Sequence, residues 1–248
     1  MGYISLAKCR EYIFEAMEQG VEAIYITGGE PLLWPWLPDF LDWYYGLDRV
    51  LPLTILTNGT LIDKKQAEYL SKYTSRGLCL RVSLECYTCE NHEKYRGQGS
   101  FQRAVQGIKN LNYFGVRPWV AFVNKSGGSV DCSGVLELER DFKQRLLEDH
   151  GLDIAGLKVI AAYSKGRFAG AVNLPEIFEL DVEKISQVQC TYGVAVSGDG
   201  VFPCPVLVDV PEARLADSLK NVIGQPVSLI KSVCASCFAT GTTCGQIS

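Results

Sequence analysis

Three short segments combine glycine, hydroxyl and acidic side chains at the ends of apolar runs. The first is Gly28-Gly29-Glu30-Pro31, which directly follows the apolar run 23–27. Glycines leave the backbone bare, so a ligand can lie against it, and a glutamate beside backbone carbonyls suits an ammonium group. An ordinary loop that needs a positive φ angle explains these four residues equally well.

The other two segments end the next two apolar runs. Thr57-Asn58-Gly59 contains the Asn-Gly pair of a two-residue hairpin, but the helical pattern after it predicts a loop at a strand end instead. Ser83 and Glu85 alternate with apolar neighbours, so both side chains are expected on the same side of a strand. Polar side chains in such a place contact a ligand or satisfy a buried hydrogen bond.

Five short apolar runs alternate with amphipathic stretches between residues 23 and 163. Strands that are apolar on both faces and alternate with helices indicate a parallel sheet or barrel. In such a barrel the active site lies at the carboxyl ends of the strands, which is where the three polar segments fall. The expected strands are 23–27, 53–57, 80–85, 119–124 and 157–163, and the expected helices are 5–19, 35–46, 63–75, 100–114 and 133–149.

The alternating pattern ends near residue 165. Residues 193–204 predict a β-hairpin around a Gly-Asp-Gly turn, and the tail after it is rich in thiols. We therefore expect two domains, a partial barrel over residues 1–170 and a small cysteine-bearing domain over residues 185–248.

The composition excludes several classes of protein. The chain has 248 residues, 47% of them hydrophobic, which is enough for a sizeable core. Its net charge is −4 and its basic residues are dispersed, so no nucleic-acid partner is expected. No apolar run approaches the ~20 residues that cross a bilayer, and the first residues lack the apolar core of a secretion signal. We expect a cytoplasmic protein without a membrane partner.

Cysteine usage points to a metal centre. In the cytoplasm the ten cysteines should stay reduced, and their clustering near the C-terminus favours metal ligation. Two cysteines beside a hairpin and a distal CxxC supply four thiolates, as iron–sulfur clusters and structural zinc both require. The candidate ligands are Cys190, Cys204, Cys234, Cys237 and Cys244.

The segments "ITGGEPLL", "TNGTLI" and "VSLE…HEKYRGQGSF", in this order and spacing, resemble the radical S-adenosylmethionine (radical SAM) family over about residues 5–165. The resemblance implies an α/β fold, a partial (β/α) barrel whose first strand is missing, followed by the small cysteine-rich β-hairpin domain. It also implies S-adenosylmethionine (SAM) as a cofactor, with its methionine ammonium held by Gly28, Gly29 and Glu30. The residues implied along its ribose and methionyl part are Thr57, Asn58, Ser83 and Glu85.

The C-terminal cysteines resemble the SPASM or twitch extension of radical SAM enzymes. This resemblance implies an auxiliary [4Fe–4S] cluster on the cysteines of residues 185–248. A full SPASM domain binds two clusters with about seven cysteines, so the five present support one cluster at most. Zinc bound by four thiolates is the alternative that the spacing leaves open.

One feature departs from the family pattern. The family binds its catalytic [4Fe–4S] cluster with a CxxxCxxC motif, whereas Cys9 is the only cysteine before Gly28. We therefore expect a fragment or a late-started chain, which by itself does not cleave SAM and gains the catalytic cluster only with the missing N-terminus. Relocation of that cluster to Cys86, Cys89 and Cys132 is a less favoured alternative.

The resemblance implies a function for the intact protein. It would reductively cleave SAM to a 5′-deoxyadenosyl radical that abstracts hydrogen from a substrate, in peptide or protein modification or in cofactor maturation. Flavodoxin or ferredoxin would donate the electron. The alternative is a non-catalytic, metal-binding scaffold protein derived from the barrel. No catalytic residue is assigned: His92 and His150 are expected at the surface or in loops, and Arg96 is expected to meet a carboxylate or cap a loop.

Overall fold

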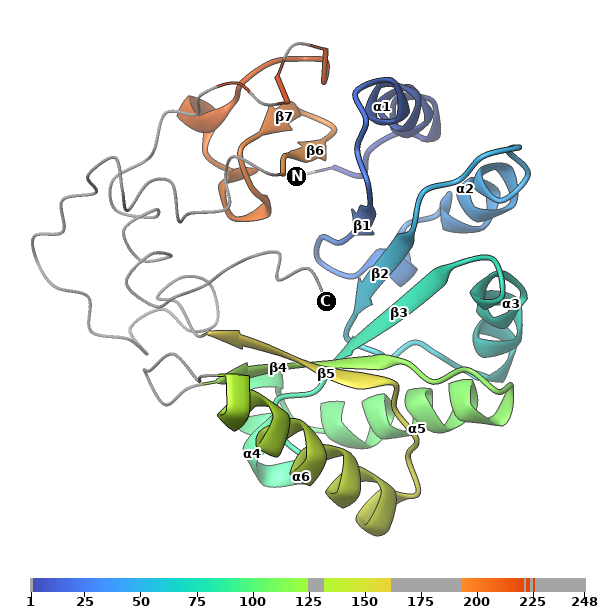
Figure 1. The fold of residues 1–248 in the computed structure, drawn as a ribbon, viewed down its shortest axis with the longest axis vertical. Helices are drawn as coiled ribbons and strands as arrows, with labels where there is room; N and C mark the ends of the chain where they lie inside the picture. Colours follow the sequence, from blue (N-terminus) through green and yellow to red (C-terminus); the bar gives the residue numbers. More distant parts are fainter. Residues whose placement is uncertain (1, 125–131, 162–192, 221, 224, 226–248) are drawn as a thin grey trace, which may run out of the picture.

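The computed structural model describes residues 2–124, 132–161, 193–220, 222, 223 and 225. Five parallel strands form one sheet in the order β1-β2-β3-β4-β5, and the helices lie along its outer side (Figure 1). The strands are β1 Ile24–Ile26, β2 Leu53–Thr57, β3 Leu78–Ser83, β4 Trp119–Asn124 and β5 Gly156–Ala161. The helices are α1 Leu6–Glu18, α2 Leu37–Tyr44, α3 Lys64–Thr74, α4 Cys89–Arg96, α5 Ser100–Tyr113 and α6 Cys132–His150.

The two faces of the sheet differ in burial. In β2 and β3 alternate residues are buried and the residues between them are half-buried. Leu53, Ile55 and Leu80 belong to the buried set and join the main core under the helices. The residues between them, such as Arg81, therefore face the concave side of the sheet, because successive side chains of a strand point to opposite faces.

The structure confirms the α/β class and the five parallel strands, with boundaries within two residues of those expected. One helix was missed. Residues Cys89–Arg96 form α4, and His92 is 2% exposed within it, so the expectation of a surface or loop histidine was wrong. The second histidine, His150, ends α6 and is half-buried, with Nε2 2.9 Å from the carbonyl oxygen of Tyr87.

The expected hairpin is present as β6 Ala195–Ser197 and β7 Gly200–Phe202, which pair antiparallel. Two 3₁₀ turns follow it, η4 Pro205–Leu207 and η5 Pro211–Ala213, and a third, η1 Pro31–Leu33, follows β1. Within the ranges that the structure describes, no helix has the length and apolar character needed to cross a membrane.

The hairpin segment packs against α1 through a buried carboxylate. Glu15, 6% exposed, accepts hydrogen bonds from the Ser218 hydroxyl at 2.7 Å and from the Leu219 amide at 2.7 Å. The Tyr12 hydroxyl donates to the carbonyl oxygen of Asp217 at 3.1 Å. Tyr12 and Leu219 also share a small apolar cluster with Val201. These contacts join segments about 200 residues apart in the sequence.

This docking should depend on pH. Burial raises the pKa of Glu15, but the hydrogen bonds from Ser218 and Leu219, together with the charges of Lys220 and Lys8, hold the pKa below its ordinary value of 4.5. A carboxylate with a depressed folded pKa stabilises the protein above its unfolded pKa, and this stabilisation is lost as the pH falls through the folded pKa. We expect the melting temperature of the wild type to fall more steeply below about pH 4.5 than that of Glu15→Gln. Parallel pH profiles for the two proteins would contradict this coupling.

Candidate functional site

The Glu30 carboxylate joins the loops that follow β1 and β2. Its Oε1 accepts hydrogen bonds from the Thr57 hydroxyl at 2.6 Å and the Leu32 amide at 3.2 Å, and its Oε2 accepts from the Asn58 amide at 2.8 Å. A carboxylate can accept about four hydrogen bonds, so about one acceptor position is left for a ligand. Glu30 therefore fixes the geometry of two strand-end loops and can still receive a donor.

The glycines before Glu30 present bare backbone to open space. A Cβ atom built on Gly28 or Gly29 would meet no described atom within 4 Å. Gly28 has a φ of 147°, which side chains of L-residues rarely allow. The glycine at this position is therefore required by backbone conformation, and the exposed peptide groups beside it are open to a ligand.

The loop after β2 is held by its own side chains and by a close approach of α5. Asn58 Oδ1 accepts from the Thr60 amide at 2.8 Å and the Thr60 hydroxyl at 2.6 Å, an arrangement typical of Asx turns. Gly59 has a φ of 74°, and a Cβ atom on Gly107 of α5 would lie 2.2 Å from its carbonyl oxygen. Glycine at position 107 thus lets α5 touch the loop that carries Asn58.

Glu85 forms a buried ion pair beyond the end of β3. It is 1% exposed, and its Oε1 accepts from Arg96 Nη2 at 2.6 Å and Nε at 2.9 Å. Its Oε2 accepts from the Val123 amide at 3.2 Å, and its own amide donates to His92 Nδ1 at 3.1 Å. Of the two roles expected for Arg96, the structure shows the contact with a carboxylate. Glu85 uses both of its oxygens to position Arg96 and the end of β4.

A cavity of about 120 Å³ lies between the loop after β2 and the ion pair. It is smaller than the ~300–1,000 Å³ typical of pockets for whole small molecules, so it suits one functional group of a larger ligand. Two guanidinium groups and three hydroxyl groups face it, and this set favours a carboxylate. Its lining residues are Asn58, Thr60, Ser83, His92, Arg96, Ser100 and Arg103.

Among the residues that line this cavity, Asn58 and Ser83 were expected as site residues from the sequence, whereas Arg103 was not. Arg103 lies one helical turn after Ser100, at the start of α5. Residues three positions apart on a helix share a face, so a serine and an arginine at this spacing after the glycine-rich "RGQG" segment were the available signal.

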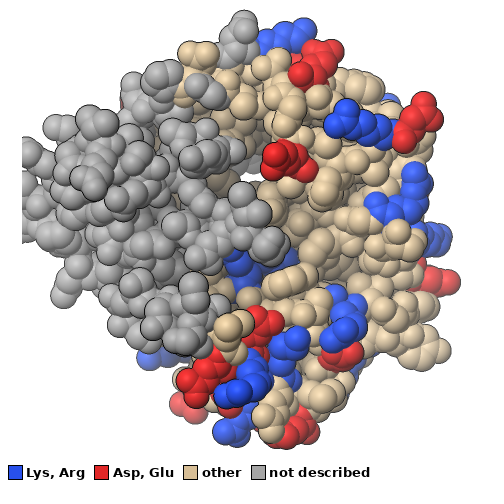
Figure 2. All heavy atoms as spheres, viewed as in Figure 1, with Lys and Arg blue, Asp and Glu red and all other residues tan. Residues whose placement is uncertain are grey.

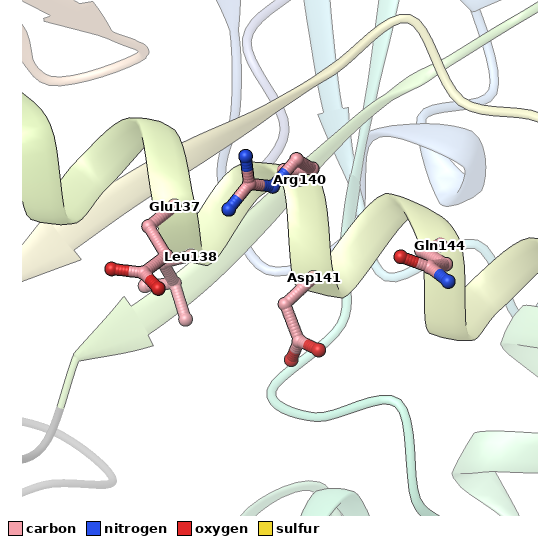
Figure 3. Close-up of a pocket in the computed structure, with 5 residues that line it drawn as sticks. All are labelled: Glu137, Leu138, Arg140, Asp141 and Gln144. Atoms are coloured by element: carbon pink, nitrogen blue, oxygen red, sulfur yellow. The ribbon is translucent and has the colours of Figure 1, made fainter.

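A larger hollow of about 500 Å³ lies along α6. Figure 3 shows that its five lining side chains, Glu137, Leu138, Arg140, Asp141 and Gln144, all come from this helix. None of them belongs to a strand end, and they bring together no set of groups from different elements. We therefore take the smaller cavity, which brings together residues from several elements, as the candidate functional site.

The predicted metal ligands fall mainly outside the described residues. Cys190, Cys234, Cys237 and Cys244 lie there, while Cys204 is half-buried at the start of η4. In the described part of the chain, no three histidine, cysteine or acidic side chains are close enough to hold a metal ion. Cys86 is half-buried, Cys89 is exposed, and the side chain of Cys132 is not among those described. The predicted cluster thus stays a prediction.

Comparison with known sequences places residues 2–124 in a family. The model of the radical SAM superfamily matches this range. The antilisterial bacteriocin subtilosin biosynthesis protein AlbA of Bacillus subtilis (strain 168) is 31% identical over 117 residues, which are 47% of this chain and 25% of AlbA. The mycofactocin maturase MftC of Mycobacterium ulcerans (strain Agy99) is 31% identical over 110 residues, 44% of this chain and 29% of MftC. The matched regions span about a quarter of these relatives.

Comparison with solved structures supports the same fold. Native anSMEcpe with bound AdoMet superimposes with a TM-score of 0.58 and 13% identity, over 90% of this chain and 71% of that chain. The structure with bound AdoMet and the Cp18Cys peptide gives a TM-score of 0.56 and 12% identity over the same shares. These structures share the fold, and the sequence match over residues 2–124 shows that this part of the chain is a radical SAM superfamily domain. Members of this superfamily use S-adenosylmethionine and an iron–sulfur cluster.

Proposed function

We propose that the strand-end loops bind the methionine part of SAM in a radical SAM enzyme. The observation that carries this proposal is the link that Glu30 makes between the glycine loop and Thr57-Asn58, beside a cavity lined by two arginines. An amino acid moiety carries an ammonium and a carboxylate on one carbon. It therefore needs acceptors and positive donors close together, and Asn58 belongs to both parts of this site.

Each residue has a distinct part in this binding mode. The exposed carbonyl groups at Gly28 and Gly29, with the remaining acceptor position of Glu30, take the ammonium. Arg103 and the Ser83 hydroxyl take the carboxylate in the cavity, since guanidinium groups favour carboxylates. Arg96 faces the same cavity while Glu85 fixes its position. Glu85, expected as a direct contact to SAM, is here proposed as a positioning residue instead.

The cofactors supply the radical chemistry and the chain supplies binding and orientation. When SAM is bound beside a reduced [4Fe–4S] cluster, its cleavage provides a 5′-deoxyadenosyl radical for hydrogen abstraction. The described residues include no ligand set for that cluster, so none of them is assigned to it. The auxiliary cluster on the cysteines of residues 185–248 stays part of the proposal, in a SPASM- or twitch-like domain.

The substrate class follows from the relatives. AlbA takes part in the biosynthesis of a bacteriocin and MftC in the maturation of mycofactocin. On this ground we propose a peptide or protein substrate for the whole enzyme, with flavodoxin or ferredoxin as electron donor. Another relative is the AdoMet-dependent heme synthase of Methanosarcina barkeri. Because of this relative, cofactor maturation is the other candidate function.

SAM affinity tests the site directly. Hydrogen bonds to charged groups contribute about 1.5–3 kcal/mol, so Arg103→Gln should weaken SAM binding by about 10- to 100-fold in anaerobic calorimetry. The control is Arg117→Gln, because Arg117 pairs with Asp153 at 2.9 Å on the surface, where both side chains are more than half exposed. Equal SAM affinities for the two variants, or no SAM binding by the wild type, would refute this binding mode.

The metal content tests the C-terminal part. After anaerobic reconstitution with iron and sulfide, we expect about four irons per chain from an auxiliary [4Fe–4S] cluster. Cys234→Ala and Cys237→Ala should each remove them. Stoichiometric zinc would contradict the auxiliary cluster, and the formation of 5′-deoxyadenosine would assign a SAM-cleaving cluster to this chain, with Cys86, Cys89 and Cys132 the first ligands to test.

A further inference from the structure

The strands carry basic side chains on the concave face of the sheet and contain no acidic residue. Arg81 in β3 and Lys158 in β5 alternate with residues buried under the helices, so both lie on this face. None of the strands β1 to β5 contains an aspartate or a glutamate. In Figure 2, atoms of Lys and Arg side chains are visible near the middle of the view. The five strands thus carry basic side chains and no acidic side chain of their own.

Arg81 is the cation with unmet hydrogen-bonding capacity. Its Nε is buried and has no hydrogen-bond partner among the described residues. Its guanidinium lies 5.7 Å from the centre of the Tyr25 ring, a cation–π contact that provides no acceptor. A buried donor left without a partner costs about 1–3 kcal/mol, so a ligand oxygen placed there would recover this loss.

A second arginine has a similar buried donor but lies elsewhere in the fold. Arg10 in α1 also has a buried Nε without a described partner, and it lies 4.9 Å from the Trp43 ring. Arg10 is on a helix outside the sheet, whereas Arg81 is on the concave face. A buried donor alone therefore does not indicate a ligand site. At Arg81 the buried donor occurs together with strands that contain no acidic residue.

Aromatic groups beside Arg81 favour a ligand with an apolar body. Trp119 is the register partner of Arg81, and Gly156 is the register partner of Trp119. A Cβ atom on Gly156 would lie 2.5 Å from the Trp119 ring, so the glycine allows the ring to pack flat against β5. Tyr25 is 53% exposed on the other side of Arg81. A ring in contact with the guanidinium, and a second ring on the neighbouring strand, suit a carboxylate attached to an apolar group.

We propose that Arg81 anchors a carboxylate of the molecule that is modified, with the apolar part of that molecule between Tyr25 and Trp119. The planar guanidinium can hold a carboxylate through two parallel hydrogen bonds. Ser83, which lines the proposed SAM cavity, lies two residues further along the same face, about 6.6 Å away at ~3.3 Å per residue. The carboxylate would thus lie further from the carboxyl ends of the strands than the proposed SAM cavity does. As a substrate site this inference rests on the proposed function, while anion binding at Arg81 is independent of it.

Matched pairs of ligands test the proposal on the full chain. The first pair is 4-phenylbutyrate and its neutral amide, and the second is a short phenylalanine-containing peptide with a free or an amidated C-terminus. Binding is measured by calorimetry with and without SAM. We expect the wild type to prefer each carboxylate over its amide by at least about tenfold, the worth of one charged hydrogen bond, and Arg81→Gln to remove this preference. Arg81→Lys should keep part of it, and Arg10→Gln all of it.

The outcomes separate the two proposals. A preference that survives Arg81→Gln, or a wild type that binds neither carboxylate better than its amide, overturns the Arg81 site. A preference lost in Arg81→Gln with SAM affinity unchanged supports it. A wild type that prefers the carboxylate in the peptide pair alone, and loses that preference in Arg81→Gln, would identify a peptide C-terminus as the source of the carboxylate. If SAM does not bind but the preference holds, the proposed function fails and the anion site stands. Thermal melting confirms that each variant is folded.

Discussion

Replacing Arg96 with methionine is expected to destabilise the protein by about 3–5 kcal/mol, because it leaves the Glu85 carboxylate buried without its counter-ion. The side chain of Glu85 is 0% exposed, so water cannot replace the guanidinium. The Val123 amide also donates a hydrogen bond to this carboxylate, but an amide does not neutralise its charge. Urea unfolding measures the effect.

The partner substitution should cost less. In Glu85→Gln the remaining charge is Arg96, whose side chain is 23% exposed and can reach water. We expect a loss of about 1–3 kcal/mol, the cost of imperfectly satisfied polar groups. The double variant should be more stable than Arg96→Met alone, since no unpaired carboxylate is left. A double-mutant cycle without coupling energy would show that the ion pair does not stabilise the fold.

The same variants report on function. Arg96 faces the cavity proposed for the SAM carboxylate, and Glu85 holds it in place. Glu85→Gln should therefore weaken SAM binding less than Arg96→Met, because the guanidinium is still present. Equal SAM affinity in the wild type and in Arg96→Met would remove Arg96 from the binding site.

Gly107→Ala is the second substitution with a large expected effect, a loss of about 3 kcal/mol of stability, at the upper end for overpacking. The added methyl group would lie 2.2 Å from the carbonyl oxygen of Gly59 and 3.3 Å from Ile62 Cβ. The first of these atoms is backbone, so either α5 or the loop must move. In an unstrained helix the same change would stabilise by about 1 kcal/mol, so even the sign of the effect tests the contact.

The functional consequence of Gly107→Ala follows from the same displacement. The loop at Gly59 also carries Thr57 and Asn58, which bond to Glu30. Small shifts of binding groups reduce ligand recognition strongly, so we expect SAM affinity to fall about tenfold or more. The control is Gln102→Ala, on an exposed position of α5, which should change stability by less than about 0.5 kcal/mol. A stable Gly107→Ala protein with wild-type SAM affinity would show that this close approach is not required.

The sequence alone predicted the five strands, most of the helices between them, and the strand ends at which the candidate site lies. Short segments in which apolar residues alternate or follow one another continuously indicate strands. Apolar residues spaced three or four positions apart indicate the helices between them. These signals are local, so the five strands appeared close to the expected positions. Glycines with forced backbone conformations, such as Gly28 and Gly59, also leave a local signal, which is why the loops that carry Glu30 and Asn58 were found.

Helix α4 was missed because its sequence lacks an apolar stripe. Its residues, "CENHEKYR", are almost all polar, and His92 is the one buried position among them. That burial is stabilised by the hydrogen bond from the Glu85 amide, a contact of tertiary structure. Histidine counts as polar in a pattern of hydrophobic residues, so the pattern of this segment predicts an exposed loop.

Pairing between distant residues was decided by the tertiary structure alone. The family resemblance implied Glu30 and Glu85 as ligand contacts. The folded chain also bonds Glu30 to Thr57 and Asn58, and it pairs Glu85 with Arg96. The hydrogen bonds from Ser218 and Leu219 to Glu15 likewise join distant parts of the chain. A carboxylate looks the same in a sequence whether it meets a ligand or a buried partner. Its role depends on which groups the packed core brings within hydrogen-bonding distance, and only the folded chain fixes that set.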